Sequence, residues 1–392
     1  MSEVRALFSV VSRPEVVSLA GGMPDVSALD GELIEKAFRS LMANRRNYAL
    51  QYGGGQGDLR LREQIQGIME LEGVHGSVED IMITTGSQHA LELISDLFLD
   101  QGDVVLVEAP SYVGAVGIFR HKEAHIEHVF TDDEGISPAA LREAGERLLA
   151  EGRKVKMLYL VPNFANPSGV TLTADRRVEV LNICQELGIL IVEDNPYGQL
   201  YFGAQPPNAI RSMDSEGVVY LGSFSKILSP GLRVGYVLAP PAIREKLVLA
   251  NESAILSPAT FAQMMVSEYL SISDWQGQIA TYRNLYREKR DSALNALSQY
   301  LPKIKTTRPE GGFFLWLTLP EGLNSKEMLP LAVTELVAYT PGTAFYGDGR
   351  GKENIRVCFS HPTAENVAVG IKRLSNVLNQ QIELLETFGS KA

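Results

Sequence analysis

The sequence contains little cysteine and little positive charge, and both shortages narrow what the chain can be. Only Cys184 and Cys358 occur among 392 residues, in unrelated contexts, so no disulfide framework and no zinc-binding spacing is present. Lysine and arginine number 36 against 47 aspartates and glutamates, giving a net charge of -11. Because nucleic acids and anionic membranes attract clustered positive charge, this balance disfavours both as partners.

Long apolar runs are also missing. Nowhere do about 18 apolar residues follow one another without a charge, proline or glycine, so we expect no membrane span. The N-terminal stretch MSEVRALFSVVSRPEV carries charges on both sides of a very short apolar segment, unlike a signal peptide. Together with the scarcity of cysteine, these features predict a cytoplasmic protein.

Two motifs resemble ligand-binding sites, one for a metal ion and one for a nucleotide phosphate, but both are better explained as ordinary secondary structure. His121, His125 and His128 lie close together, but the segment is expected to pass from a helix into a strand there, so no metal site is predicted. Residues 53–57, GGGQG, are rich in glycine but lack the Lys-Ser/Thr of a nucleotide phosphate loop. We expect this segment to lead into a helix that begins near Asp58.

Alternating strands and helices in the middle of the chain predict the fold class. Several strands are apolar on both faces and are joined by helices, which indicates a mostly parallel sheet covered on both sides. The expected strands are residues 81–84, 104–110, 155–162, 188–194, 218–221 and 233–240. The chain is therefore predicted to be an α/β protein with a large doubly wound domain.

A second, smaller α+β domain is expected towards the C-terminus. A long helix from about 272 to 300 should lead into it. The domain would contain the strands GGFFLWLTL at 311–319 and IRVCFS at 355–360, followed by a closing helix from about Thr363. The predicted division is an N-terminal arm over 1–45, a large domain over 46–285 and a small domain over 286–392.

The most informative stretch is YLGSFSKILSPGLRVGYVLAP, residues 220–240. It places Lys226 in a turn after a buried strand, with Ser223 and Ser225 before it and Arg233 seven residues after it. An amine beside phosphate-binding hydroxyls and a guanidinium suits a pyridoxal phosphate enzyme, in which the lysine bonds the cofactor aldehyde. On its own, such a stretch is also typical of a solvated loop.

Further polar residues follow other strands, at the edge where doubly wound sheets bind ligands. Glu193 and Asp194 end a buried strand; a carboxylate there needs a partner, such as a pyridinium nitrogen, or it caps a following helix. Asn163 and Asn166 lie in the loop PNFANPSG, which is either a simple turn or a source of an amide donor to a cofactor oxygen.

The junction ITTGSQHALEL offers a candidate phosphate site. Gly86, Ser87 and Gln88 stand where a strand gives way to a helix, and the exposed N–H groups of a helix start bind anions well. The alternative is an ordinary helix cap by Ser87.

Taken in order, these motifs resemble the fold-type I pyridoxal phosphate-dependent aminotransferases, and most of all the subgroup of 2-aminoadipate and kynurenine aminotransferases. The resemblance runs from SLAGGMPD at Ser18 to IRVCFS at Ile355 and rests on an ordered set of motifs. These are LQYGGGQGDLRLRE, TTGSQHAL, PSY, PNFANPSG, EDNPY, GSFSKILSPGLRVGY and IRVCFS. The resemblance implies a mostly parallel, seven-stranded type of sheet in the large domain.

The resemblance also implies roles for the residues around the cofactor. Lys226 corresponds to the lysine that forms the Schiff base and shuttles the proton, and Asp194 to the partner of the pyridinium nitrogen. Asn166 and Tyr197 correspond to donors to the phenolic oxygen. Tyr112 corresponds to the aromatic residue that stacks on the ring, although it could equally be a core residue. The implied phosphate ligands are Ser87, Gln88, Ser223, Ser225 and Arg233.

The remaining roles concern the substrate and a second subunit. Arg356 corresponds to the guanidinium that clamps the substrate α-carboxylate. Gly22, with Gly21, matches a mobile segment that covers the substrate. Tyr52 matches a tyrosine that reaches the partner's phosphate across a homodimer interface. Arg5 matches an arginine that can meet an acidic substrate side chain, or it is simply a solvated helix residue.

The resemblance therefore implies an aminotransferase that moves an amino group from an aromatic, branched-chain or 2-aminoadipate-like L-amino acid to a 2-oxo acid, 2-oxoglutarate above all. Two alternatives remain: another pyridoxal phosphate reaction on the same scaffold, such as a lyase or oxidase, and a regulator that carries this domain behind a DNA-binding module. Only some 17 residues precede SLAGG, and the chain is acidic, which disfavours the regulator.

Overall fold

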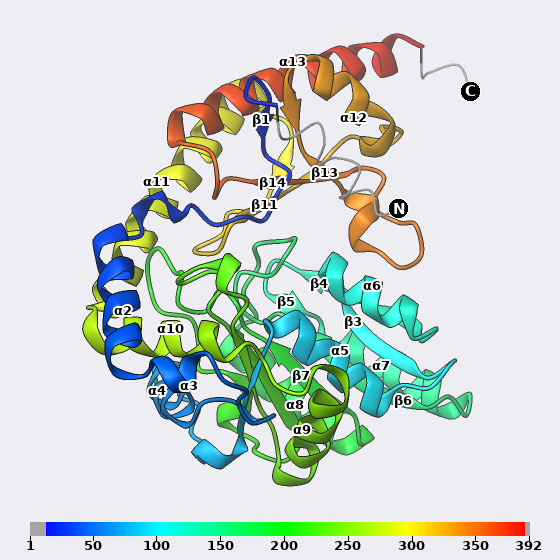
Figure 1. The fold of residues 1–392 in the computed structure, drawn as a ribbon. Coiled ribbons are helices and arrows are strands. Elements are labelled where there is room, and N and C mark those ends of the chain that lie inside the picture. Colours follow the sequence, from blue (N-terminus) through cyan, green and yellow to red (C-terminus); the bar gives the residue numbers. More distant parts are fainter. Residues whose placement is uncertain (1–12, 389–392) are drawn as a thin grey trace.

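A computed structural model describes residues 13–388 and contains one large and two small sheets (Figure 1). The large sheet has eight strands in the order β2-β9-β8-β7-β6-β3-β4-β5. Its strands are β2 (Ile81–Thr84), β3 (Val104–Ala109), β4 (His125–Asp132), β5 (Gly135–Ile136), β6 (Val155–Leu160), β7 (Leu190–Asp194), β8 (Val218–Ser223) and β9 (Gly235–Leu238). The neighbours from β8 through β4 pair in parallel, which confirms the predicted mostly parallel sheet.

Helices cover both faces of this sheet because alternate residues of each strand point to opposite sides. In β3, Val105 and Val107 belong to the same core as α5 (Ser87–Phe98) and α6 (Val113–His121). Val104 and Leu106 instead pack with α7 (Pro138–Ala150) and α8 (Ala174–Leu187). The remaining helices of this part are α2 (Gly31–Asn44), α3 (Arg46–Ala49), α4 (Leu59–Glu70), α9 (Pro241–Ile255) and α10 (Thr260–Ile272).

The smaller sheets lie on the other side of the molecule in Figure 1, reached by the long helix α11 (Trp275–Tyr300). One has the order β10-β11-β14-β13 and the other pairs β1 with β12 in parallel. The strands are β1 (Val17–Ser18), β10 (Lys305–Thr306), β11 (Phe314–Thr318), β12 (Val337–Ala338), β13 (Thr340–Pro341) and β14 (Asn354–Cys358); the helices are α12 (Ser325–Thr334) and α13 (Ala364–Phe388). Through β1, the beginning of the described chain is attached to its C-terminal part.

Short 3-10 helices complete the described elements: η1 (Val26–Ala28), η2 (Val78–Asp80), η3 (Ile210–Ser212), η4 (Pro230–Leu232) and η5 (Gly342–Phe345). Over residues 13–388, no helix combines the length and the apolar character that a membrane crossing requires. In the same range, no three His, Cys, Asp or Glu side chains are grouped as a metal site would need. The histidine-rich segment does pass from α6, which ends at His121, into β4, which begins at His125.

Candidate active site

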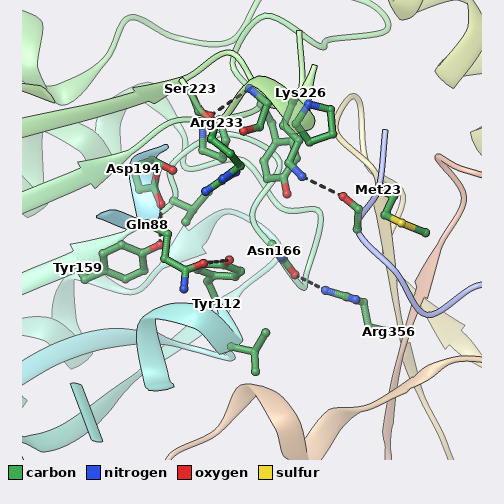
Figure 2. Close-up of a pocket in the computed structure, with 18 residues that line it drawn as sticks. Met23, Gln88, Tyr112, Tyr159, Asn166, Asp194, Ser223, Lys226, Arg233 and Arg356 are labelled. Atoms are coloured by element: carbon green, nitrogen blue, oxygen red, sulfur yellow. Dashed lines mark hydrogen bonds between the residues drawn. The ribbon is translucent and has the colours of Figure 1, made fainter. Parts of the chain in front are cut away.

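A cavity of about 300 Å³ lies between the large sheet and the smaller β11-β14 sheet (Figure 2). It is lined by Gly22, Met23, Ser87, Gln88, Tyr112, Val113, Tyr159, Val161, Asn166, Asp194, Pro196, Tyr197, Ser223, Ser225, Lys226, Pro230, Arg233 and Arg356. The strands β2, β6, β7 and β8 all end at this edge of the large sheet, so residues far apart in the sequence meet here. Among the residues that the structure describes, every residue given a role by the family resemblance lines this one cavity, with the exceptions of Tyr52 and the neighbouring Gly21.

Lys226 lies in the turn after β8, three residues beyond the end of the strand, and points into the cavity (Figure 2). Its Nζ donates a hydrogen bond to the carbonyl oxygen of Gly22 at 2.9 Å. Burial lowers the pKa of this amine to about 8, and the guanidinium groups of Arg356 and Arg233 act in the same direction. A lysine in this state can lose its proton near neutral pH, as a nucleophile or base must.

Asp194 ends β7 with its carboxylate buried under the cavity. Its Oδ2 accepts a hydrogen bond from Tyr159 Oη at 2.9 Å, whereas its Oδ1 is buried without a hydrogen-bond partner. Burial raises the pKa of Asp194 to about 6, against the opposing effects of the Tyr159 hydrogen bond, the Ser87 hydroxyl and the positive charge of Lys226. An unpaired buried carboxylate oxygen that borders a cavity is suited to a cationic N–H group of a ligand.

The start of α5 and the turn before β9 form a cradle for an anion. Gly86 precedes α5, and no side chain caps this helix start, so the first N–H groups remain as donors. Arg233 is held close by, with Nη2 donating to the Thr85 carbonyl at 3.2 Å. Ser223 and Ser225 line the same cavity from the end of β8.

Two glycines keep this cradle open. A Cβ on Gly86, whose φ is +83°, would lie 2.5 Å from Nη2 of Arg233. A Cβ on Gly235 would lie 2.6 Å from the backbone nitrogen of Ser87. The close approach of the arginine to the helix start therefore depends on the absence of side chains at both positions.

Aromatic side chains form the walls of the cavity. Tyr112 precedes α6, and its Oη donates to Gln88 Oε1 at 3.4 Å. Tyr197 packs edge-on against Phe313 and Phe314, with ring centroids 5.4 and 5.9 Å away. Burial raises the pKa of both tyrosines, so both hydroxyls remain protonated donors at neutral pH.

Arg356, from β14, enters the cavity on the side facing Lys226 (Figure 2). Its Nη1 donates to Asn166 Oδ1 at 2.8 Å, and its Nη2 donates to the Ala20 carbonyl and to Thr340 Oγ1. Nε is buried without a partner, and within residues 13–388 no Asp or Glu carboxylate is among the groups that act electrostatically on this guanidinium. A buried guanidinium that lacks a counter-ion is suited to bind an anionic group of a small ligand.

These residues fit pyridoxal phosphate. The α5 cradle with Arg233 suits the phosphate, and the unpaired Oδ1 of Asp194 suits the ring nitrogen. Lys226 would supply the amine that bonds the aldehyde. The Asn166–Arg356 bond uses the oxygen of the Asn166 amide, so its N–H groups are the donors that a cofactor oxygen would meet.

Two neighbouring polar residues belong to the scaffold instead. Glu193 accepts backbone N–H groups of Ile210 and Arg211, both at 2.9 Å, on the sheet face away from the cavity. Asn163 joins Arg177 and Asn195 through its side-chain amide. The side-chain oxygens of both residues already accept hydrogen bonds from the protein. Both residues therefore have a structural role and not a role in ligand binding.

Sequence reasoning missed Tyr159 and Met23, which also line the cavity. A tyrosine near the end of the largely apolar strand VKMLYL was the available signal for Tyr159. Tyr52 is 80% exposed and does not line its own chain's cavity. Arg5 lies outside the described residues, so its predicted role stays a prediction.

Comparison with known proteins identifies the family. The family model "Aminotransferase class I and II" matches residues 14–374. The chain is 39% identical to aromatic-amino-acid aminotransferase 1 of Thermococcus litoralis, covering 97% of this chain and 92% of that protein. It is 36% identical to 2-aminoadipate transaminase of Thermus thermophilus, covering 98% and 95%.

The structure of Pyrococcus horikoshii kynurenine aminotransferase in complex with PMP superposes with a TM-score of 0.93 at 39% identity, covering 97% of this chain and 95% of that one. The predicted fold class, the aminotransferase activity and the pyridoxal phosphate cofactor are thereby confirmed at the level of the family. The chain belongs to the class I and II aminotransferases, which are fold-type I enzymes.

Proposed function

We propose that this enzyme transfers the amino group of an aromatic, branched-chain or 2-aminoadipate-like L-amino acid to 2-oxoglutarate. The main support for the proposal is that three side chains with complementary chemistry line one cavity. Lys226 has an amine that titrates near neutral pH, Asp194 has a carboxylate oxygen without a hydrogen-bond partner, and Arg356 has a guanidinium without a counter-ion. The names of the two relatives, one aromatic and one 2-aminoadipate aminotransferase, support the aromatic and 2-aminoadipate-like donors of this range.

Each residue has a distinct task in the proposed mechanism. Pyridoxal phosphate, when bound, supplies a ring that accepts the electron pair released at the substrate Cα. Arg356 binds the α-carboxylate, and Asn166 fixes the orientation of the guanidinium through the 2.8 Å bond. Lys226, with a pKa of about 8, would act as the base that removes the proton from the substrate Cα. Asp194 would hold the ring nitrogen in its protonated form.

The apolar lining residues Met23, Val113 and Val161 support a preference for apolar substrate side chains. The Arg356 guanidinium itself contacts two aromatic rings, with its Cζ 4.4 Å from the ring centroid of Phe314 and 4.9 Å from that of Phe345. Of the charged residues that line the cavity, Arg233 is assigned to the phosphate and Arg356 to the α-carboxylate. An acidic substrate side chain would therefore need a further cation, for which Arg5 remains the proposed candidate.

We also propose a cytoplasmic homodimer with shared active sites. A shallow groove lined by Leu50, Tyr52, Ile255 and Phe261 exposes between 37% and 80% of each of these side chains. Exposed apolar clusters of this kind are typical of subunit interfaces. In the dimer, the partner's Tyr52 would reach the phosphate cradle, and the three-part division at residues 45 and 285 would describe each subunit.

A spectral half-reaction tests the activity. Purified holoenzyme is mixed with single L-amino acids (Glu, 2-aminoadipate, Leu, Val, Phe, Trp and kynurenine) without any 2-oxo acid. We expect conversion of the cofactor to its pyridoxamine form, with rates that rank the donors; adding 2-oxoglutarate should then restore the starting spectrum. A lyase would release product without accumulating the pyridoxamine form, and an unchanged spectrum across the panel would contradict the proposal.

A further inference from the structure

Lys289 is a buried cation on α11 whose contacts point towards the active site. Its side chain is 2% exposed, and its Nζ donates to Asp25 Oδ2 at 2.6 Å and to the Ser360 carbonyl oxygen at 2.8 Å. Asp25 ends the stretch Gly21–Asp25, and Ser360 follows β14, the strand that carries Arg356. One ammonium group therefore joins two segments that both border the cavity.

The first of these segments is held at Met23 and at Asp25 by hydrogen bonds near Lys289. The backbone N–H of Asp25 donates to Tyr286 Oη at 2.9 Å, and its Oδ1 accepts the Ser27 N–H at 2.9 Å. Burial alone would raise the pKa of Asp25, but the hydrogen bonds from Lys289 and Ser27 outweigh it and lower the pKa, so Asp25 is the anion of the pair. Ser360 Oγ donates to the Met23 carbonyl at 2.6 Å.

The same segment touches the groups that the proposed mechanism uses. The Gly22 carbonyl oxygen accepts a hydrogen bond from the Lys226 amine at 2.9 Å, and the Ala20 carbonyl oxygen accepts one from Arg356 Nη2. Gly22 and Met23 also line the cavity. Any shift of residues 20–25 would therefore change the surroundings of Lys226 and Arg356.

Stability alone is a poor reason for this ion pair. Burying an ammonium and a carboxylate costs desolvation that their attraction barely offsets, and well-packed apolar side chains at such positions are often equally stable. What an ion pair adds over apolar packing is a defined geometry between the two segments.

We propose that Lys289 is a positioning residue of the active site, whose ammonium group holds residues 20–25 against the Arg356 strand so that Gly22 and Met23 close over the bound substrate. The inference rests on the proposed aminotransferase function. It assigns to α11, which links the two parts of the molecule, a direct influence on substrate binding.

The test compares four variants: Lys289→Met, Asp25→Asn, the double variant Lys289→Met/Asp25→Asn, and Arg176→Met as a matched control. Arg176 forms an ion pair with Asp132 at 2.6 Å near β4 and β5, away from the cavity. The double variant leaves no unpaired charge, so it should fold even where a single variant is too unstable to purify. Holoenzyme is assayed with the fastest donor of the amino acid panel.

We expect KM for the amino donor to rise about tenfold in Lys289→Met and in the double variant, as loss of a charge-assisted hydrogen bond predicts, while kcat changes much less. Hydrogen exchange of the amides of residues 19–27, measured in the cofactor-free protein, should accelerate in the same variants. Arg176→Met should lower the melting temperature and leave both readouts unchanged.

Wild-type KM and wild-type exchange in the double variant would overturn the proposal, because the pair would then contribute to stability alone. The exchange measurement needs no turnover. If the wild-type protein converted none of the donors, the proposed function would fail, while exchange would still show whether Lys289 holds residues 19–27 in place.

Discussion

Burial determines how readily each ionisable active-site residue gains or loses its proton. Lys226 and Asp194 both border the cavity, yet desolvation moves their pKa values towards neutrality from opposite sides, to about 8 and about 6. Neither shift could be foreseen from the residue types, because it depends on how much water the surrounding elements exclude. Because burial disfavours the charged form of each group, a bound partner of opposite charge would stabilise that form.

Replacing Lys226 with Ala should reduce turnover by at least about 10²–10⁴-fold, the usual contribution of a positioned base, and abolish the covalent link to the cofactor. Steady-state rates with the fastest donor and 2-oxoglutarate measure the first effect, and mass spectrometry after borohydride reduction measures the second. Lys122→Ala is the control, since Lys122 pairs with Glu92 on the surface. Substantial turnover by the Lys226→Ala enzyme would refute the assigned role.

Glu108 has no role in the proposed mechanism, so it can be used to test how burial changes the pKa of a carboxyl group. It ends β3 buried, accepts the Val161 N–H at 2.8 Å, and burial raises its pKa to about 8. Its folded pKa exceeds the unfolded value of 4.5, so its stabilising contribution is complete below pH 4.5 and is lost as the pH rises towards 8. The loss amounts to at most about 1.4 kcal/mol per pH unit.

Glu108→Gln retains an acceptor for Val161 and removes this titration. We therefore expect the variant to match the wild type near pH 5 and to be more stable at pH 8. Melting temperatures measured from pH 5 to pH 9 would show a shallower decline for the variant. The exposed Glu151→Gln should follow the wild-type curve, and identical curves for Glu108→Gln and the wild type would refute the assigned pKa.

At the scale of elements, the anion cradle arises from the way α5 and β9 meet. β2 and β9 are adjacent and antiparallel, so the turn after β2 lies beside the turn before β9. This pairing brings Gly86 and Arg233, which are far apart in the sequence, to the same helix start. The strength of the site therefore depends on close backbone approach as much as on the arginine itself.

Gly86→Ala tests this dependence. The new Cβ would lie 2.5 Å from Arg233 Nη2 and would also strain a backbone with φ +83°. Gly102 has the same φ of +83° but no atom within 4 Å of its Cβ position, so Gly102→Ala isolates the strain. Both variants should lose about 1 kcal/mol of stability. Only Gly86→Ala should weaken pyridoxal phosphate binding, by about tenfold or more, as equilibrium titration of the apoprotein would measure.

At the scale of the whole molecule, the proposed dimer makes each active site depend on two chains. Tyr52 is exposed and lies outside the cavity of its own chain, whereas the other predicted cofactor ligands line that cavity. An active site built from two chains can be tested without a structure of the dimer, because it predicts that two inactive variants complement each other.

Tyr52→Ala and Lys226→Ala should each be largely inactive alone. Co-refolded in equal amounts, they should recover about a quarter of wild-type activity, since half of the dimers are mixed and one of the two sites in each mixed dimer is intact. Turnover with the fastest donor measures the recovery. If Tyr52 acted within its own chain or not at all, the mixture would show only the average of the two parent variants.

The sequence by itself determined the order of strands and helices, because hydrophobic periodicity and strand-end polar residues are local signals. The strand at 81–84 agrees with β2 to the residue, and the helix expected from about 272 to 300 is observed at Trp275–Tyr300. The ordered motifs also determined the family, and with it twelve of the 18 residues that line the cavity; Met23, Val113, Tyr159, Val161, Pro196 and Pro230 were not predicted.

Only the tertiary structure decided which residues meet and in what state. Tyr159 beneath Asp194, Lys289 between Asp25 and Ser360, and the unpaired oxygen of Asp194 all depend on contacts between distant segments. The pKa values of Lys226 and Glu108 likewise depend on the water that those segments exclude. Local sequence patterns carry no record of such distances, because desolvation and hydrogen-bond pairing are properties of the packed molecule.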